Sequence, residues 1–331
     1  MQPTTTWSSA HHHDSFKQVL QSYLQLTKPR IIPLLLIATA GSMWIAAKGH
    51  VAPVLLLVTL VTGALAAASA QVINCVYDRD IDYDMERTRH RPLPSGRVKV
   101  RDALIFSALL AIASFGLQAW VANLLSACLS MVGIALYVGV YTHWLKRTST
   151  QNFVIGGAAG AIPPLVGWAA VTGELSWAAW VIFAIVFIWT PPHFWGLAMV
   201  IQEDYAKVGI PMLPVVVGNE KTAQQIWWYS LLLVPTTLLL VYPLGVVGGI
   251  YAAAASALGY VFLKKAWTLL QAPDDKDLAR GLFKYSIFYM MLLSAGMVGD
   301  QLPWIQQISL ALGDRVMMLL SAIPMVAAAL G

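Results

Sequence analysis

The feature that most constrains the fold is a dense cluster of charges between two long uncharged runs. The segment 74–96, NCVYDRDIDYDMERTRHRPLPSG, holds four aspartates, one glutamate and four arginines. Residues 53–73 before it and 103–145 after it contain no Asp, Glu, Lys or Arg. Because about 20 apolar residues are enough for a helix to cross a bilayer, these runs predict membrane-spanning helices joined by a charged loop.

The overall composition extends this interpretation to the whole chain. Of the 331 residues, 58% are hydrophobic and 11% are charged, whereas soluble domains carry about 25% charged residues. The net charge of +5 arises between the apolar runs, so it indicates membrane topology and not nucleic-acid binding. The two cysteines exclude a disulfide framework and a cysteine metal quartet.

We therefore predict an all-α, polytopic membrane protein with nine transmembrane helices. The expected domains are a flexible cytoplasmic tail at 1–25, a transmembrane domain at 26–302 and an apolar C-terminal segment at 303–331. Within that last segment, residues 316–330 are too few to span a bilayer and are expected at its interface. The predicted spans are 31–47, 54–76, 103–121, 124–141, 153–171, 177–199, 226–244, 247–265 and 283–301.

The placement of lysine and arginine predicts the orientation. All of them except Lys48 and Arg315 fall in the N-terminal segment, or in and beside the loops after spans two, four, six and eight. Since loops rich in Lys and Arg stay in the cytoplasm, we expect the N-terminus and these four loops there. An odd number of spans then places the C-terminus on the opposite side.

Within the charged loop, Asn74, Asp78 and Asp82 recur every four residues. On a helix they share an arc of about 80°, while Asp80 and Asp84 fall on the other side. Oxygen ligands on one arc suit Mg²⁺, which proteins hold with one or two carboxylates plus substrate phosphates. The alternative is a solvated loop, but polar groups that begin at membrane depth favour a functional site.

Basic side chains at the predicted cytoplasmic ends of the spans are candidates for binding phosphate. Guanidinium groups bind phosphate oxygens through two parallel hydrogen bonds. For the pair before the first span, a positive-inside anchor is an equally good interpretation, and it is also the alternative for Lys146 and Arg147, where the phosphate role is slightly favoured. The candidates are Arg87, Arg89 and Arg91 after the stripe, Lys146 and Arg147 after the fourth span, and Lys28 and Arg30 before the first.

A weak internal repeat relates the second and sixth spans. Each ends in an acidic cluster that contains Asp-Tyr and continues to a proline-bracketed turn, DYDMERTRHRPLPSG in one case and EDYAKVGIPMLPVVVG in the other. The repeat suggests two similar halves whose loops face one cavity. Glu203 and Asp204 form a weaker second cation site, because adjacent helical residues do not share a face.

Two further segments concern the spans themselves. The glycines and alanines of 156–168, GGAAGAIPPLVGW, permit close contact between helices. In the sixth span, Pro191 and Pro192 are expected to break the helix beside a cavity. His193 follows directly, so it is expected at membrane depth, either as a packing residue or as part of a site.

Taken together, these residues resemble the UbiA-type intramembrane prenyltransferases. The resemblance covers residues 26–302 and rests on the Asn74–Asp78–Asp82 spacing, the RTRHRPLPSG tail, the second acidic loop and the nine spans. Seven segments are similar in order to those of the haem-farnesylating members: LTKPR, NCVYDRDID, ERTRHRPL, YTHWLKRTSTQN, GGAAGAIPPLVGW, TPPHFWGLA and DYAKVGIPMLPVV.

The resemblance implies a bundle around a central cavity open to the cytoplasm, in the plasma membrane of a bacterium. It implies Mg²⁺ on Asn74, Asp78 and Asp82, with Asp204 as a further candidate ligand. A second aspartate pair found in many members is missing, because Val200 and Ile201 occupy its place. The implied catalytic residues are Asn74, Asp78, Asp82, Arg87, Arg91, Lys146, Arg147 and Asp204, and the implied substrate-binding residues are Lys28, Arg30, Tyr141, His143, Asn152, His193 and Tyr205.

The implied reaction transfers a farnesyl group from farnesyl diphosphate to a vinyl group of haem b, adds water, and gives haem O and diphosphate. Haem b is then a substrate and not a cofactor, and haem A synthase or a haem-copper oxidase assembly pathway is the implied downstream partner. One alternative is the same machinery with another acceptor, such as an aromatic acid, a quinone precursor or chlorophyllide. A cation-coupled transporter is the other, although the nearly uncharged outer loops do not favour it.

Overall fold

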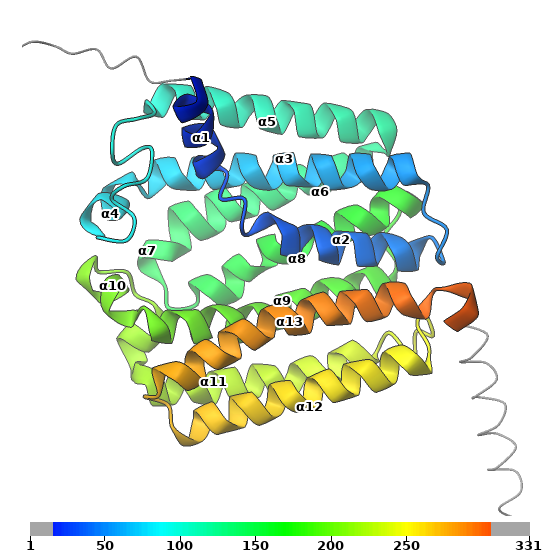
Figure 1. Ribbon diagram of the computed structural model, residues 1–331. Coiled ribbons are helices and arrows are strands. Elements are labelled where there is room, and N and C mark those ends of the chain that lie inside the picture. The colour runs from blue at the N-terminus through cyan, green and yellow to red at the C-terminus, as the bar shows by residue number, and fades with distance from the viewer. Residues whose placement is uncertain (1–15, 306–331) are drawn as a thin grey trace, which may run out of the picture.

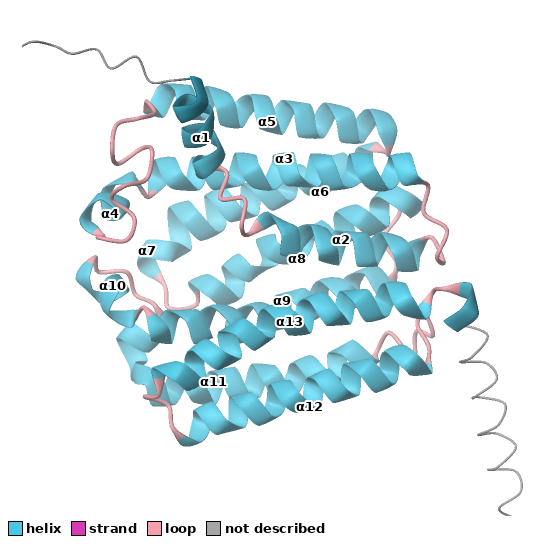
Figure 2. Cartoon of the chain, viewed as in Figure 1, coloured by secondary structure: helices cyan, strands magenta, loops and turns pink. Residues whose placement is uncertain are grey.

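The structure is a computed structural model that describes residues 16–305. These residues form helices and loops, without a strand among them, which confirms the all-α prediction (Figure 1 and Figure 2). The helices are α1 (Phe16–Leu26), α2 (Ile32–Ala46), α3 (Pro53–Tyr77), α4 (Arg79–Asp84), α5 (Val100–Val121), α6 (Leu124–Ala135), the π-helix η1 (Leu136–Leu145), α7 (Lys146–Thr148), α8 (Asn152–Thr172), α9 (Trp177–Val200), α10 (Gln202–Lys207), α11 (Leu213–Leu238), α12 (Gly249–Gln271) and α13 (Lys276–Asp300).

The number of spans differs from the prediction. Each of the nine predicted spans coincides with a long helix or, for the fourth, with α6 and η1 in sequence. Only six segments of the described chain are both long and apolar enough to cross a membrane: 53–77, 100–121, 124–148, 152–172, 177–200 and 276–300. The class of polytopic membrane protein therefore holds, while the count of nine is not confirmed.

The other three helices differ from the six for identifiable reasons. Helix α2 has 15 residues, fewer than a straight crossing needs. Helix α11 begins at residue 213 instead of the predicted 226, so it includes Glu220 and Lys221. Its backbone kinks at Gly218, where φ is 82° and ψ is 171°, a conformation that favours glycine. Helix α12 carries Lys264 and Lys265 in its second half.

The long helices run back and forth, so that alternate loops gather at the two ends of the bundle. Helices α4, α7 and α10 lie at one end together with α1 and the α12–α13 loop, as Figure 1 shows on its left side. The basic loops predicted to share one side therefore do so. That this side is cytoplasmic stays a prediction.

The expected flexible tail is wrong for residues 16–25, which form helix α1. Its amphipathic pattern buries Ser22 and Leu26. The Tyr23 ring packs edge-on against Phe106 of α5 with centroids 5.0 Å apart, and Arg97 donates to Ser22 Oγ at 3.1 Å. The prediction rested on the polar composition of this segment and did not consider the amphipathic spacing of its apolar residues. Residues 1–15 and the predicted interfacial segment 316–330 lie outside the described residues.

The predicted break at the two prolines of the sixth span is also wrong. Helix α9 continues through Pro191 and Pro192 to Val200. The prolines remove the two backbone donors that would bond the carbonyls of Phe187 and Ile188, and the helix continues without them. The close approach of a neighbouring helix, here α8 at Gly157, lets a membrane helix accommodate proline.

The predicted close contact at the glycines of α8 is confirmed. A Cβ added at Gly157 would lie 2.8 Å from Cγ2 of Thr190 on α9, and one at Gly167 would lie 2.7 Å from the carbonyl oxygen of Thr39 on α2. A Cβ at Gly156 would overlap the ring of Tyr141. Helix α8 therefore lies directly against α2, η1 and α9, and the hydrophobic core lies largely around α8, α9 and the later helices.

Exposed aromatic side chains mark both ends of the bundle. Trp120, Trp177 and Trp304 are exposed at or just beyond the ends of α5, α9 and α13 that lie away from the basic loops. Trp144 and Trp267 are exposed near the ends of η1 and α12 that lead into those loops. Tryptophan is enriched where a membrane meets water, because its ring is apolar and its N–H is polar. The exposed tryptophans near the helix ends and the apolar helices between them are typical of an integral membrane protein.

Candidate active site at the basic end of the bundle

The predicted polar stripe is buried where α3 meets α4. Asn74, Asp78 and Asp82 have 2%, 2% and 4% of their surface exposed, whereas Asp80 and Asp84 are exposed. The three residues do not share one helix, because α3 ends at residue 77 and α4 begins at residue 79. Backbone bonds from Asp78 N to Asn74 O (2.9 Å) and from Asp82 N to Asp78 O (2.8 Å) preserve the spacing. The predicted shared face is therefore confirmed across a helix boundary.

A lysine contacts each of the first two residues of the stripe. Lys28 Nζ donates to Asn74 Oδ1 at 2.6 Å, and the Asn74 amide donates in turn to Thr142 Oγ1 of η1 at 3.1 Å. Lys146 Nζ donates to Asp78 Oδ2 at 2.5 Å. Both lysines come from the ends of other helices, so three chain segments converge on the stripe.

Lys28 has an unusual backbone and environment. Its φ is 48°, a left-handed conformation that residues other than glycine rarely adopt. Burial lowers the pKa of its ammonium group, and the nearby positive charges of Arg91 and Lys146 act in the same direction. Of the two interpretations of the LTKPR segment, the contact with Asn74 favours the phosphate-facing one for Lys28. Arg30 is exposed and makes no recorded contact with the stripe among the described residues.

An arginine pairs with the third residue of the stripe. The Nη1 atom of Arg91 donates to both carboxylate oxygens of Asp82, at 2.9 Å and 2.8 Å. The Asp82 carbonyl accepts a bond from the Thr88 hydroxyl at 3.0 Å, which fixes the turn that returns Arg91 to α4. The RTRHRP segment thus folds back on the stripe, as its predicted role with phosphate requires.

The oxygen donor atoms of the stripe are of the kind that bind a divalent cation. Asp78 Oδ1 is buried and has no hydrogen-bond partner within residues 16–305, although an enclosed carboxylate oxygen is costly to leave unpaired. The described residues include no group of three or more His, Cys, Asp or Glu side chains arranged for a metal. Two carboxylates and an amide suit Mg²⁺ when a diphosphate supplies the remaining oxygens.

The second acidic loop meets the first through one ion pair. Asp204 Oδ2 of α10 lies 3.7 Å from Nε of Arg87, in the loop after α4. Glu203 points elsewhere and pairs with Lys276 of α13 at 2.8 Å. The two adjacent carboxylates therefore face different neighbours, as predicted. Burial raises the pKa of the neighbouring Tyr205 phenol, so it remains protonated.

Two predicted site residues lie away from the stripe. Arg147 donates to both carboxylate oxygens of the exposed Asp80 at 2.7 Å, and to the Tyr77 carbonyl at 2.8 Å. It therefore fastens α7 to the outer face of α4 instead of facing the stripe. His143 is exposed, and its ring packs edge-on against Tyr77 with centroids 5.3 Å apart. The sequence spacing could not show that Arg147 would differ in its contacts from the adjacent Lys146, or His143 from the nearby Tyr141.

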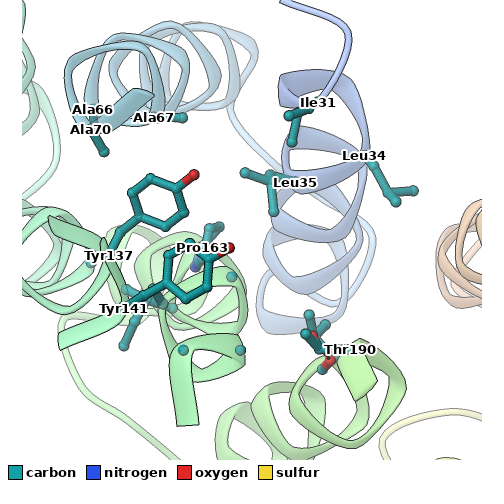
Figure 3. A pocket seen from close by; sticks show the side chains of 18 of the residues that line it. Ile31, Leu34, Leu35, Ala66, Ala67, Ala70, Tyr137, Tyr141, Pro163 and Thr190 are labelled. Atoms are coloured by element: carbon teal, nitrogen blue, oxygen red, sulfur yellow. Dashed lines mark hydrogen bonds between the residues drawn. The ribbon is translucent and has the colours of Figure 1, made fainter. Parts of the chain in front are cut away.

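An apolar cavity of about 230 Å³ lies between α2, α3, α6, η1, α8 and α9. Its wall includes Gln71, one helical turn before Asn74. Figure 3 shows the rings of Tyr137 and Tyr141 projecting between these helices, opposite Leu35 of α2. Most other lining residues are aliphatic or small. The arrangement joins a polar, cation-rich end to an apolar chamber.

The π-helix η1 supplies residues that sequence reasoning missed. Tyr137 donates to Gln71 Oε1 at 3.2 Å, and Thr142 accepts from the Asn74 amide. π-Helical turns are rare and often occur at functional sites. Gln71 could have been found as a polar residue inside an apolar run, three positions before Asn74. Nothing in the sequence distinguishes η1 from the α-helix that precedes it.

Three further predicted substrate-binding residues lie in the bundle away from the stripe. Asn152 is fully buried at the start of α8, where its amide donates to Met212 Sδ at 3.5 Å and its Oδ1 has no partner within the described chain. His193 of α9 lines the cavity, as does Tyr141 of η1, whose ring stacks on Phe153 with centroids 6.3 Å apart.

Comparison with known proteins relates this site to a family. The model of the UbiA prenyltransferase family matches residues 34–292. A protoheme IX farnesyltransferase from Trichormus variabilis is 70% identical over 295 residues, which cover 89% of this chain and 93% of the relative. A protein of the same name from Synechocystis sp. is 63% identical over 305 residues, covering 92% of this chain and 96% of the relative.

Solved structures share the fold. A digeranylgeranylglyceryl phosphate synthase matches with a TM-score of 0.72 at 21% identity, covering 87% of this chain and 99% of that one. A UbiA homolog from Archaeoglobus fulgidus bound to GPP and Mg²⁺ matches with a TM-score of 0.60 at 16% identity, covering 83% and 99%. Such low identities establish the fold alone. The family match and the similar sequences establish more: this chain belongs to the UbiA prenyltransferase family.

Proposed function

We propose that this protein transfers a farnesyl group from farnesyl diphosphate to a vinyl group of haem b, with addition of water, to give haem O and diphosphate. The observation that carries the proposal is that a buried oxygen stripe, contacted by three basic side chains, lies one helical turn from the wall of an apolar cavity. A diphosphate requires the first part and an isoprenoid chain the second. Relatives named protoheme IX farnesyltransferase support haem as the acceptor.

At the polar end, Asn74, Asp78 and Asp82 are the proposed Mg²⁺ ligands. When bound, Mg²⁺ supplies positive charge that stabilises the diphosphate as it leaves the allylic carbon. The Asp78 oxygen without a partner offers the first ligand position. Asp204 is placed to approach from the opposite loop, because its partner Arg87 follows α4.

Lys28, Arg91 and Lys146 are the proposed diphosphate-binding groups. Each now contacts one residue of the stripe, so each lies within reach of a phosphate held beside it. Positive groups fixed in advance at a developing negative charge lower the barrier without reorganisation during the reaction. The buried position of the stripe strengthens these interactions, since bulk water is excluded.

The apolar cavity is the proposed chamber for the farnesyl chain and the porphyrin. Breaking the allylic C–O bond leaves positive charge on the farnesyl carbon, and the faces of Tyr137, Tyr141 and Phe153 can stabilise that charge. The farnesyl carbon then bonds to the vinyl group. Water captures the new cation beside the porphyrin and releases a proton, which leaves a hydroxyl group on the product.

The proposed location is the plasma membrane of a bacterium, with the basic end in the cytoplasm and the C-terminus on the other side. The asymmetric placement of Lys and Arg supports this orientation. The proposed fate of the product is delivery to haem A synthase or to a haem-copper oxidase assembly pathway.

Product analysis tests the reaction. Membranes that contain the protein receive haem b, farnesyl diphosphate and Mg²⁺, and the extracted haems are resolved by mass spectrometry. We expect a haem heavier by a farnesyl group plus water, and its absence after EDTA treatment. Unchanged haem alongside correctly inserted protein would contradict the proposal, and the same membranes would then be supplied with aromatic and chlorin acceptors.

A further inference from the structure

His193 occupies an aromatic pocket in the wall of the cavity. It lies on α9 with 8% of its surface exposed. Its ring stacks on Trp189 with centroids 4.3 Å apart and an interplanar angle of 18°, and it packs against Phe283 of α13 at 4.8 Å. Stacking on Trp189 and the contact with Phe283 restrict the plane of the imidazole and leave its edges to bind other groups.

One edge of the ring is held by Ser286 of α13. His193 Nδ1 lies 2.7 Å from Ser286 Oγ, and the same hydroxyl donates to the carbonyl of Phe283 at 2.7 Å. A hydroxyl has one proton, and a carbonyl can only accept. Both contacts are therefore satisfied when Ser286 donates to Phe283 and accepts from Nδ1–H. This assigns the proton to Nδ1 and a lone pair to Nε2.

The other edge of the ring faces the open cavity. His193 lines the cavity, and Nε2 is not among the fully enclosed polar atoms that lack a partner in the described chain. Of the residues that line the cavity, His193 is the one with an imidazole, and the lining contains no cysteine, methionine or lysine. A neutral imidazole nitrogen with an open approach is a strong ligand for iron.

We propose that His193 Nε2 is an axial ligand of the haem iron when haem b occupies the cavity, and that Ser286 positions His193 by fixing its tautomer. This inference rests on the proposed function, because it assumes a haem substrate. Metal-binding histidines usually donate their other ring N–H to a fixed acceptor, which orients the ring and raises its basicity. Ser286 is such an acceptor.

The assignment also gives the porphyrin a defined position. The cavity that contains His193 reaches Gln71, one turn before Asn74 of the stripe. Iron held at His193 keeps the porphyrin in the same chamber as the farnesyl chain, so the vinyl group and the allylic carbon share one apolar space. His193 is thus a substrate-binding residue and Ser286 a positioning residue.

Spectroscopy of bound haem tests the ligand. The full-length protein, purified in lipid nanodiscs, is titrated with ferric haem b without farnesyl diphosphate and followed by absorption and electron paramagnetic resonance. Because the His11-His12-His13 run could bind haem by itself, all samples carry alanine at these three positions. His193→Ala is compared with His50→Ala, which removes an exposed histidine in the loop between α2 and α3.

We expect the spectrum of imidazole-ligated iron in the parent chain and in His50→Ala, and its loss in His193→Ala. Added imidazole restores the ligated spectrum in His193→Ala. Ser286→Ala keeps the ligand but weakens haem affinity by about tenfold. Metal-free protoporphyrin, which offers no iron, binds the parent and His193→Ala equally.

Two outcomes would overturn the inference: an unchanged spectrum in His193→Ala, or an equal loss of affinity for haem and for metal-free protoporphyrin. The same preparations are assayed for farnesylated haem. Product formation with a spectrum independent of His193 would reject the ligand and leave the proposed function intact. A His193-dependent spectrum without any product would reject the proposed function and leave a haem site.

Discussion

The junctions α3–α4 and α9–α10 have the same backbone plan and different side chains. Helix α3 has 25 residues and α9 has 24, and each is followed by one non-helical residue and a six-residue helix. Asp78 occupies that residue in the first junction and Ile201 in the second. The internal repeat predicted from the two Asp-Tyr clusters is therefore visible in the fold.

The difference between the junctions lies in what they bury. The first encloses an amide and two carboxylates with basic partners, whereas the second has Val200 and Ile201 at its boundary and pairs Glu203 with Lys276 on the outside. Only Asp204 reaches across, to Arg87. Both junctions can therefore accommodate polar groups, but only the α3–α4 junction has the side chains for a candidate metal and phosphate site. We infer that the chemistry is concentrated in the first half.

The largest expected effect comes from Asp78→Asn. Replacing a carboxylate oxygen that has no partner within residues 16–305 should lower turnover at least about 100-fold, the scale seen when a group that stabilises developing charge is removed. Steady-state product formation in membranes measures it, with protein insertion checked by immunoblot. The matched control is Asp80→Asn, on the exposed face, which should lose less than about tenfold. Equal losses would show that the two faces of α4 are not distinct.

Arg91→Gln is expected to rank second. It leaves the Asp82 carboxylate buried without its arginine and removes a proposed phosphate ligand, so turnover should fall by about 10- to 100-fold. Arg91→Lys should restore only part of it, because an ammonium cannot match the guanidinium geometry. Arg101→Gln, whose partner is Asp102 on the surface of α5, serves as the control. Full activity in Arg91→Gln would remove this arginine from the site.

The contact between the two halves should have a smaller effect. Arg87 and Asp204 are partly exposed and 3.7 Å apart, so a double-mutant cycle of Arg87→Gln and Asp204→Asn should give a coupling of at most about 1 kcal/mol. Turnover should fall less than about tenfold in either single variant. A loss in Asp204→Asn as large as that in Asp78→Asn would mean that both junctions carry essential ligands.

The smallest effect concerns the outer face of α4. Hydrogen bonds from Arg147 hold the pKa of Asp80 at about 2, below its ordinary 3.8. A carboxyl with a lowered folded-state pKa stabilises the fold above about pH 4, and this contribution disappears as the pH falls towards 2. Because the pair is exposed, its contribution is at most about 1 kcal/mol. Thermal unfolding of the parent and Asp80→Asn should differ slightly at pH 6 and converge near pH 2; a constant difference would contradict the pairing.

Sequence periodicity predicted the helical class, the basic end and the buried stripe, because these depend on apolar runs and on spacing along one chain. The predicted number of membrane spans was not confirmed where polar residues extend a helix, as in α11, or where the apolar helix is short, as in α2. The proline break failed because a neighbouring helix packs closely against α9, which continues through Pro191 and Pro192.

The sequence could not predict which side chains of the site contact one another. Lys146 and Arg147 are adjacent, yet one contacts the buried Asp78 and the other the exposed Asp80. Gln71 and Tyr137 meet only because η1 packs against α3, and Ser286 reaches His193 from 93 residues further along the chain. Such contacts depend on the three-dimensional packing and leave no local pattern.

The most direct test of the asymmetry between the junctions is metal binding. Mn²⁺ replaces Mg²⁺ as a probe, and its affinity for the full-length protein with farnesyl diphosphate is measured by electron paramagnetic resonance. We predict that Asp78→Asn weakens Mn²⁺ binding at least about tenfold, while Glu203→Gln leaves it unchanged. Unaltered binding in Asp78→Asn, or its loss in Glu203→Gln, would contradict a metal site built at the α3–α4 junction.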